Sequence, residues 1–137
     1  MPSIKIISLP DNFYSQTRGW SFAPFKNSEL IDSIEADWTT FHLVSVEPGT
    51  IRGNHFHPQG TEWLFFCGSP LLLVWQESDS EKINQQRITD RHTFAVIPPG
   101  IKHAIKNVGA EVLVLVAFRS PSPASGEAET LPSLLIE

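Results

Sequence analysis

Three histidines and one glutamate are the residues of this chain whose types and spacing best suit chemistry. His55 and His57 are separated by one residue, and Glu62 follows shortly after. The third histidine, His103, lies much later in the sequence. Three imidazoles and one carboxylate are a complete set of protein ligands for a divalent transition metal such as Zn, Fe, Mn, Ni or Cu. We therefore predict a metal site with one or two positions open to water or substrate.

A β-strand is the element that would place the first two histidines together. Side chains alternate faces along a strand, so His55 and His57 would point to one side and Phe56 to the other. A turn through residues 58–60 would return the chain and let Glu62 open the neighbouring strand within reach of the same point.

Short strands separated by turns are predicted for most of the chain. Apolar or alternating runs rich in β-branched and aromatic residues occupy residues 4–9, 39–46, 63–67, 71–76, 93–97 and 111–118. A tight turn at residues 98–100 can bring His103 from a distant part of the chain. One short helix is plausible at residues 27–36. Many short strands with regular turns indicate an all-β sandwich or barrel.

Length and composition restrict the class of protein. The chain has 137 residues, which suits a single domain over residues 1–137. A net charge of −5 with scattered basic residues argues against nucleic acid as a partner. No apolar run approaches the roughly 20 residues that span a bilayer. With no signal-peptide pattern and Cys67 as the single cysteine, we expect a cytoplasmic location and no membrane partner.

The tail over residues 120–137 differs from the rest of the chain. Its first part is rich in serine and proline, whereas residues 131–136 are too apolar to be left in water. Such a segment is buried along an edge of the barrel or against a second subunit. We predict a homodimer, with a tail folded onto its own barrel as the alternative.

Two sequence patterns resemble the two motifs of the cupin superfamily. The first contains Gly49, His55, His57, Glu62 and Gly68, and the second contains Pro98, Gly100, His103 and Asn107. The resemblance covers residues 39–118 and implies a double-stranded β-helix, or cupin jelly-roll barrel, with the ligands lining its interior. His42 and His92 lie outside the pattern and are predicted to be ordinary histidines, and Asn107 is predicted to be a turn residue.

A second resemblance concerns the substrate. The segments around Arg18-Gly19 and Arg52-Gly53 are similar to paired Arg-Gly elements of sugar-nucleotide 3,5-epimerases of the dTDP-4-dehydrorhamnose type. The second segment also resembles cupin domains joined to reductases in capsular polysaccharide synthesis. The resemblance implies that Arg18 and Arg52 contact the substrate and that His55 acts as a base.

The leading hypothesis is a metal-binding cupin that acts as an epimerase or isomerase on a keto sugar or sugar nucleotide. The metal would polarise a carbonyl oxygen, and Glu62 would serve as a ligand or as the catalytic base. One alternative is a cupin that binds a sugar or another small molecule without catalysis. Another is a metal-dependent dioxygenase, because the same ligand set serves Fe in such enzymes.

Overall fold

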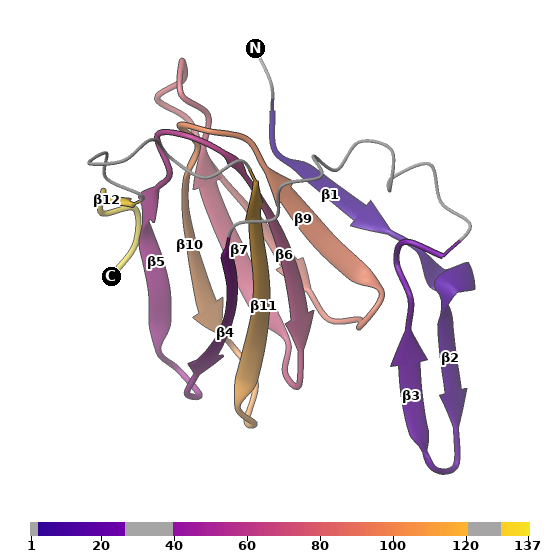
Figure 1. The fold of residues 1–137 in the computed structure, drawn as a ribbon. Helices are drawn as coiled ribbons and strands as arrows, with labels where there is room; N and C mark the ends of the chain where they lie inside the picture. Colours follow the sequence, from indigo (N-terminus) through magenta and orange to yellow (C-terminus); the bar gives the residue numbers. More distant parts are fainter. Residues whose placement is uncertain (1–2, 27–39, 121–129) are drawn as a thin grey trace.

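A computed structural model describes residues 3–26, 40–120 and 130–137. The described chain is almost entirely β-structure, and two five-stranded antiparallel sheets face each other as a jelly roll (Figure 1). The predicted all-β cupin fold is therefore confirmed. The helix predicted at residues 27–36 lies outside the described residues. Among the residues that are described, no helix has the length and apolar character needed to cross a bilayer.

Each sheet mixes strands from distant parts of the chain. The first sheet has the order β1 (Lys5–Ser8), β9 (Thr93–Ile97), β6 (Thr61–Cys67), β11 (Leu113–Ser120) and β4 (Thr40–Val46). The second has the order β12 (Leu131–Pro132), β5 (Ile51–Phe56), β10 (Lys102–Asn107), β7 (Leu71–Gln76) and β8 (Ile83–Ile88). A short 3-10 helix, η1 (Pro10–Asn12), leads into a separate hairpin of β2 (Phe13–Gln16) and β3 (Gly19–Phe22).

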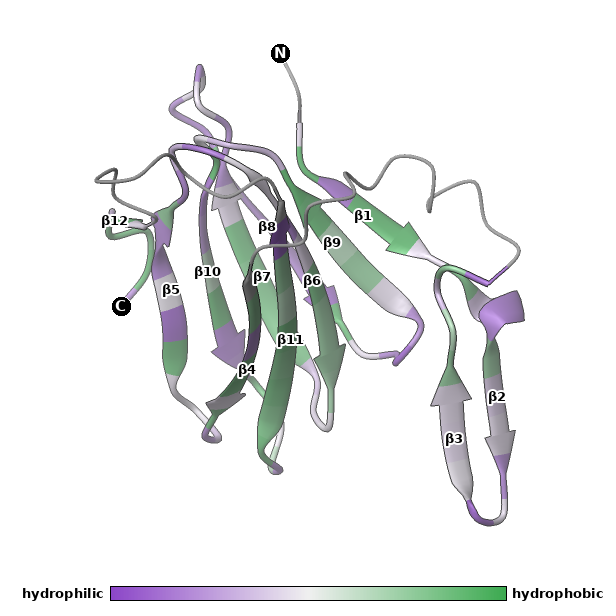
Figure 2. Cartoon of the chain, in the orientation of Figure 1, coloured by the Kyte–Doolittle hydropathy of each residue, from purple (hydrophilic) through white to green (hydrophobic). Residues whose placement is uncertain are grey.

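The main core lies between the two sheets and follows the alternation of the strands. On β11, Leu113, Leu115 and Ala117 are buried, and on β7, Leu71 and Leu73 are buried against them. Apolar residues dominate β7, β9 and β11 (Figure 2). Burial of one such large side chain stabilises the fold by roughly 1.5–3 kcal/mol. Two of the predicted strands, residues 71–76 and 93–97, have the observed boundaries of β7 and β9.

Strands β2, β3, β8, β10 and β12 were not among the predicted strands. The polar segment of β8 includes Gln85, Gln86 and Arg87, which are exposed at the edge of the second sheet. An edge strand buries little, so its sequence lacks the apolar run that marks an interior strand.

A β-bulge in β5 decides which of its side chains face the interior. His103 of β10 pairs with His55, but the next residue, Ala104, pairs with Gly53, so Asn54 is an extra residue without a partner on β10. Gly53 has φ +98°, and a Cβ atom there would lie 2.9 Å from the carbonyl oxygen of His103. Only glycine fits this approach.

The bulge also changes the side of the strand on which Arg52 lies. Strict alternation would place Arg52 and His55 on opposite faces. Instead, Arg52 pairs with the buried Ile105, two residues from His103, and so shares the interior face with His55.

Candidate functional site

Three histidines meet between the sheets. His55 and His103 come from the paired strands β5 and β10, and His57 follows directly after β5. Their ring centroids are 4.8–5.4 Å apart, and one nitrogen of each lies within 4.8 Å of the others. Two nitrogens bound to one ion at about 2.1 Å are at most about 4.2 Å apart. Small rotations of the rings would therefore bring the cluster to ligating distance.

Glu62 reaches the cluster from the opposite sheet. Its side chain is 4% exposed, with Oε2 3.2 Å from His57 Nε2 and Oε1 3.4 Å from His103 Nε2. The site therefore joins the two sheets, and all four predicted ligands lie in one place.

Arg119 is a member of the site that the sequence analysis missed. It pairs with Glu62 across β11 and β6, and its Nε donates a hydrogen bond of 2.8 Å to Glu62 Oε2. A signal was present in the sequence, because Arg119 continues the alternation of the buried Leu115 and Ala117. A charged residue on the buried face of a strand needs a partner of opposite charge.

Electrostatics favour an anionic Glu62 and a neutral His55. Burial raises the pKa of Glu62, but contacts with the imidazoles of His103 and His57 outweigh burial and hold this pKa well below its ordinary value. Burial, with added repulsion from His103 and His57, lowers the pKa of His55 to about 4. At neutral pH, His55 therefore offers a nitrogen lone pair beside a buried negative charge.

The hydrogen bonding of His103 gives a direct test of whether a cation fits. Its Nδ1 lies 3.0 Å from the carbonyl oxygen of Ile101, which can only accept, so Nδ1 carries the hydrogen. In the neutral ring the lone pair is then on Nε2, which is buried and has no hydrogen-bond partner in the part of the chain that the structure describes. This lone pair faces the Glu62 carboxylate at 3.4 Å, an arrangement that calls for a proton or a cation between them. The donor set suits a divalent transition metal.

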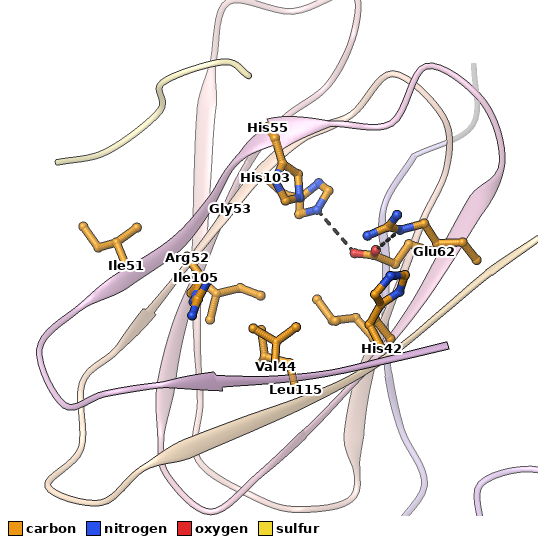
Figure 3. A pocket seen from close by; sticks show the side chains of 13 residues that line it. His42, Val44, Ile51, Arg52, Gly53, His55, Glu62, His103, Ile105 and Leu115 are labelled. Atoms are coloured by element: carbon orange, nitrogen blue, oxygen red, sulfur yellow. Dashed lines mark hydrogen bonds and ion pairs between the residues drawn. The ribbon is translucent and has the colours of Figure 1, made fainter. Parts of the chain in front are cut away.

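A cavity of about 390 Å³ opens beside the cluster. Its polar lining comes from His42, Arg52, His55, Glu62, His103 and Arg119, and its apolar lining includes Val44, Leu64, Ile105 and Leu115. Figure 3 shows His55, His103 and Glu62 at one side of this space and Val44, Ile105 and Leu115 at another. Arg52 lies beside Ile105, as the bulge requires.

The two predicted substrate arginines lie in different places. Arg52 lines the cavity, and its Nε donates a 3.2 Å hydrogen bond to the carbonyl oxygen of Ser45. Arg18 is exposed in the turn between β2 and β3, where it lines a separate surface pocket with Tyr14 and Trp20. The structure thus brings Arg52, but not Arg18, to the cavity.

His42, predicted from the sequence to be an ordinary histidine, lies at the cavity. It lies on β4, half-buried, and lines the cavity. Its Nδ1 is buried and has no hydrogen-bond partner within residues 3–26, 40–120 and 130–137. His92 differs, since it lies near the surface with Nε2 3.5 Å from Asp90. Asn107 is fully buried and bonds only to neighbouring protein groups, which is a structural role.

Comparison with known proteins agrees with this geometry. Residues 28–125 match the family model described as the polysaccharide biosynthesis C-terminal domain. The chain belongs to this family. Among curated proteins, oxalate decarboxylase OxdC from Bacillus subtilis (strain 168) is 29% identical over 75 residues, which are 54% of this chain and 19% of that protein.

Solved structures show the same fold at low sequence identity. The sugar 3,4-ketoisomerase QdtA from Thermoanaerobacterium thermosaccharolyticum, in complex with TDP, has a TM-score of 0.68 and 13% identity over 93% of this chain and 86% of that one. RmlC from Streptococcus suis, in complex with dTDP-D-xylose, has a TM-score of 0.69 and 15% identity, and the match covers 90% of this chain and 68% of that one. The capsular polysaccharide assembling protein CapF from Staphylococcus aureus has a TM-score of 0.64 and 18% identity, covering 72% of this chain.

The chain spans only 29% of the length of CapF and 19% of that of oxalate decarboxylase. Its neighbours of similar length, QdtA and RmlC, share the cupin-type jelly roll. These likenesses confirm the cupin-type jelly-roll fold.

Proposed function

We propose that this chain is an isomerase or epimerase that acts on a keto sugar carried by a nucleotide, with a divalent transition metal in its site. The cluster of three histidines and a buried carboxylate, beside a cavity that His55, His103 and Glu62 line, carries the proposal. The family description, the ketoisomerase title of QdtA and the nucleotide-sugar complex of RmlC support this substrate class.

In this proposal, His55, His57 and His103 hold the metal, with Glu62 as the fourth ligand. When bound, the metal supplies Lewis-acid polarisation of a carbonyl oxygen. Glu62 balances part of the cation's charge in a dry site, and Arg119 fixes the orientation of the carboxylate through its 2.8 Å bond.

Proton transfer is best assigned to His42. An imidazole that donates its lone pair to a metal is not free to act as a base. Glu62 has a lowered pKa and is held by Arg119, so it is a weak base. His42 lines the same cavity from β4 and is outside the ligand set. Tyr14, the sole tyrosine, lies on β2 outside the cavity.

The proposed reaction conserves all atoms. His42 removes a proton from the carbon next to the sugar carbonyl, and the bonding electrons move to the carbonyl oxygen as an enolate. Addition of a proton from water to the opposite face of that carbon gives an epimer, and His42 releases its proton to water. Alternatively, the former carbonyl carbon and its oxygen each gain a proton while the neighbouring hydroxyl loses its own, which moves the carbonyl by one position and gives an isomer.

Arg52 is proposed to bind the phosphates at the mouth of the cavity. Its guanidinium is exposed on the face that also carries His55, and arginine binds phosphate oxygens in pairs. A cavity of about 390 Å³ is at the low end for small-molecule sites, which suits a sugar ring with the nucleotide outside. The predicted contact of Arg18, the homodimer and the single domain over residues 1–137 stay predictions.

The reaction is tested with TDP-4-keto-6-deoxyglucose in D₂O, followed by NMR. Deuterium should appear at the carbon next to the carbonyl, and His42→Gln should slow this at least about 100-fold. His92→Gln, a surface histidine, is the matched control and should leave the rate unchanged. Saturable binding without deuterium uptake would indicate a binding module, and substrate-dependent oxygen uptake would indicate a dioxygenase.

The metal is tested separately by elemental analysis of the purified protein. We expect about one transition metal ion per chain, retained in His92→Ala and lost in His57→Ala and His103→Ala. Full metal content in His57→Ala would remove the metal from the proposal.

A further inference from the structure

The last described segment of the chain lies along the outer edge of the second sheet. Strand β12 pairs with β5, with Leu131 opposite Phe56 and Pro132 opposite His55 (Figure 1). The segment therefore runs directly beside His55, one of the three residues of the histidine cluster.

Asn54 anchors this segment. Because Asn54 is the extra residue of the bulge, it has no partner on β10, and its amide is satisfied by the tail instead. Its Oδ1 accepts hydrogen bonds from the backbone N–H of Leu135 (2.9 Å) and Ile136 (3.1 Å), and its Nδ2 donates to the carbonyl oxygen of Ile136 (2.9 Å). Its own carbonyl oxygen accepts from the N–H of Ser133 at 2.7 Å. These four bonds join the bulge to residues 133–136.

The anchored segment places a hydroxyl on the cluster. Thr130 Oγ1 lies 3.2 Å from Nδ1 of the buried His57, whose Nε2 faces Glu62. His103 has a different arrangement, since its Nδ1 meets the carbonyl oxygen of Ile101, which fixes one tautomer. A hydroxyl can donate or accept, so Thr130 can support His57 with the hydrogen on either nitrogen.

We infer that residues 130–137 are a positioning element of the site: the segment is clamped by Asn54 and sets Thr130 against His57, which orients that ring toward Glu62. This rests on the proposed function only in taking the histidine cluster as the site. Thr130 is a positioning residue, because it acts through His57 and does not line the cavity. In a metal-bound state, such a partner typically improves affinity by about 10–100-fold.

The test is ¹⁵N NMR of the histidine side chains in the metal-free protein, with the His57 signals assigned from His57→Gln. Thr130→Val should shift both ring nitrogens of His57 and leave His92 unchanged. Thr130→Ser, which restores the hydroxyl, should restore the wild-type shifts. Asn54→Gly should reproduce the effect of Thr130→Val, because it removes the three side-chain bonds of the clamp while fitting the positive φ of this position.

Thr50→Val is the matched control, since Thr50 Oγ1 bonds only locally to the carbonyl oxygen of Glu47 near the other end of β5. It should leave the His57 signals unchanged. A zinc competition assay should show about tenfold weaker binding for Thr130→Val and normal binding for Thr130→Ser. Unchanged His57 signals in Thr130→Val, or in Asn54→Gly, would overturn the inference. Absence of isomerase activity together with the expected NMR shifts would refute the proposed function alone.

Discussion

An asparagine lies near each end of the β5–β10 strand pair. The two asparagines form hydrogen bonds to different parts of the chain. At one end, Asn107 is fully buried, and its Nδ2 donates to the carbonyl oxygens of Val46 (2.8 Å) and Glu111 (2.7 Å). At the other end, within the part of the chain that the structure describes, the amide of Asn54 bonds only to the C-terminal segment. One asparagine joins parts of the barrel itself, and the other joins the barrel to a separable segment.

This difference suggests that one end of the strand pair stabilises the fold and that the other end carries the site. The Asn107 end holds loops that bound the main core, since both Val46 and Leu113 nearby are fully buried. The Asn54 end carries the bulge, the histidine cluster and the cavity. Functional sites tend to lie where local stability is lower. We therefore expect substitutions at the Asn107 end to act on global stability and those at the Asn54 end to act on the site.

The largest loss of unfolding free energy is expected for Asn107→Ala. It removes the donor to two carbonyl oxygens, those of Val46 and Glu111, and the acceptor of the Gly109 N–H. An unsatisfied buried polar group costs about 1–3 kcal/mol, so we expect a loss of about 3 kcal/mol or more. Urea denaturation at unchanged m value measures it. Ser69→Ala removes one contact to the same amide and should cost only about 1 kcal/mol. Equal losses in the two variants would contradict the role given to Asn107.

Two glycines, one near each end, give the next prediction. Gly53→Ala should cost about 2 kcal/mol, because it adds a Cβ atom 2.9 Å from the His103 carbonyl oxygen at φ +98°. Gly49→Ala has φ +78° but meets no atom within 4 Å, so it should cost only about 1 kcal/mol.

The two glycine variants should also differ in their affinity for zinc. Gly53→Ala pushes β5 away from β10 and should weaken zinc binding, whereas Gly49→Ala should not. If both variants bound zinc normally, the close approach at Gly53 would not be needed for the histidine cluster.

The sequence predicted the barrel and the convergence of His55, His57, Glu62 and His103, for a physical reason, whereas metal binding by this group stays a prediction. A strand, a turn and a returning strand bring the first three of these residues toward one point. Arg119 was missed, and His42 was predicted to be an ordinary histidine, because neither residue belongs to a motif. Each reaches the interior only through the alternation of its strand, and this becomes visible once β11 and β4 are known to flank the cavity.

The bulge could not be predicted from the sequence pattern. The sequence Arg-Gly-Asn-His does not indicate that Asn54 lacks a paired residue on the neighbouring strand. The register depends on β10, about fifty residues later in the chain. The apolar tail was predicted to fold onto its own barrel or onto a second subunit. The described part of it lies on its own barrel, held by the residue that the bulge exposes. The homodimer is not tested by this placement.

A smaller loss of unfolding free energy is expected when the pH is lowered, and it should come from His55 at the Asn54 end. In the metal-free folded protein, His55 has a pKa of about 4, whereas the ordinary value is 6.5. The unfolded chain therefore binds a proton at His55 before the folded chain does, and stability should fall as pH drops from about 6.5 to 4. His55→Asn should reduce this slope. Asn107→Ala should lower stability equally at each pH, because its hydrogen bonds do not titrate. An unchanged slope in His55→Asn, measured by urea denaturation with a chelator present, would contradict the neutral state of His55.

The smallest effect on global stability is expected for Asn54→Gly. The segment that it releases buries little, since Leu131 and Leu134 remain 38% and 65% exposed. Glycine is preferred to alanine here because Asn54 has φ +55°. We expect a loss of about 1 kcal/mol or less in urea denaturation, yet at least tenfold faster amide exchange at Ser133, Leu135 and Ile136, because local opening no longer breaks the clamp. Asn54→Asp keeps the acceptor for two of these amides and should lie between Asn54→Gly and wild type. If Asn54→Gly instead lost as much stability as Asn107→Ala, the segment would belong to the cooperative core, and the two ends of the strand pair would not differ.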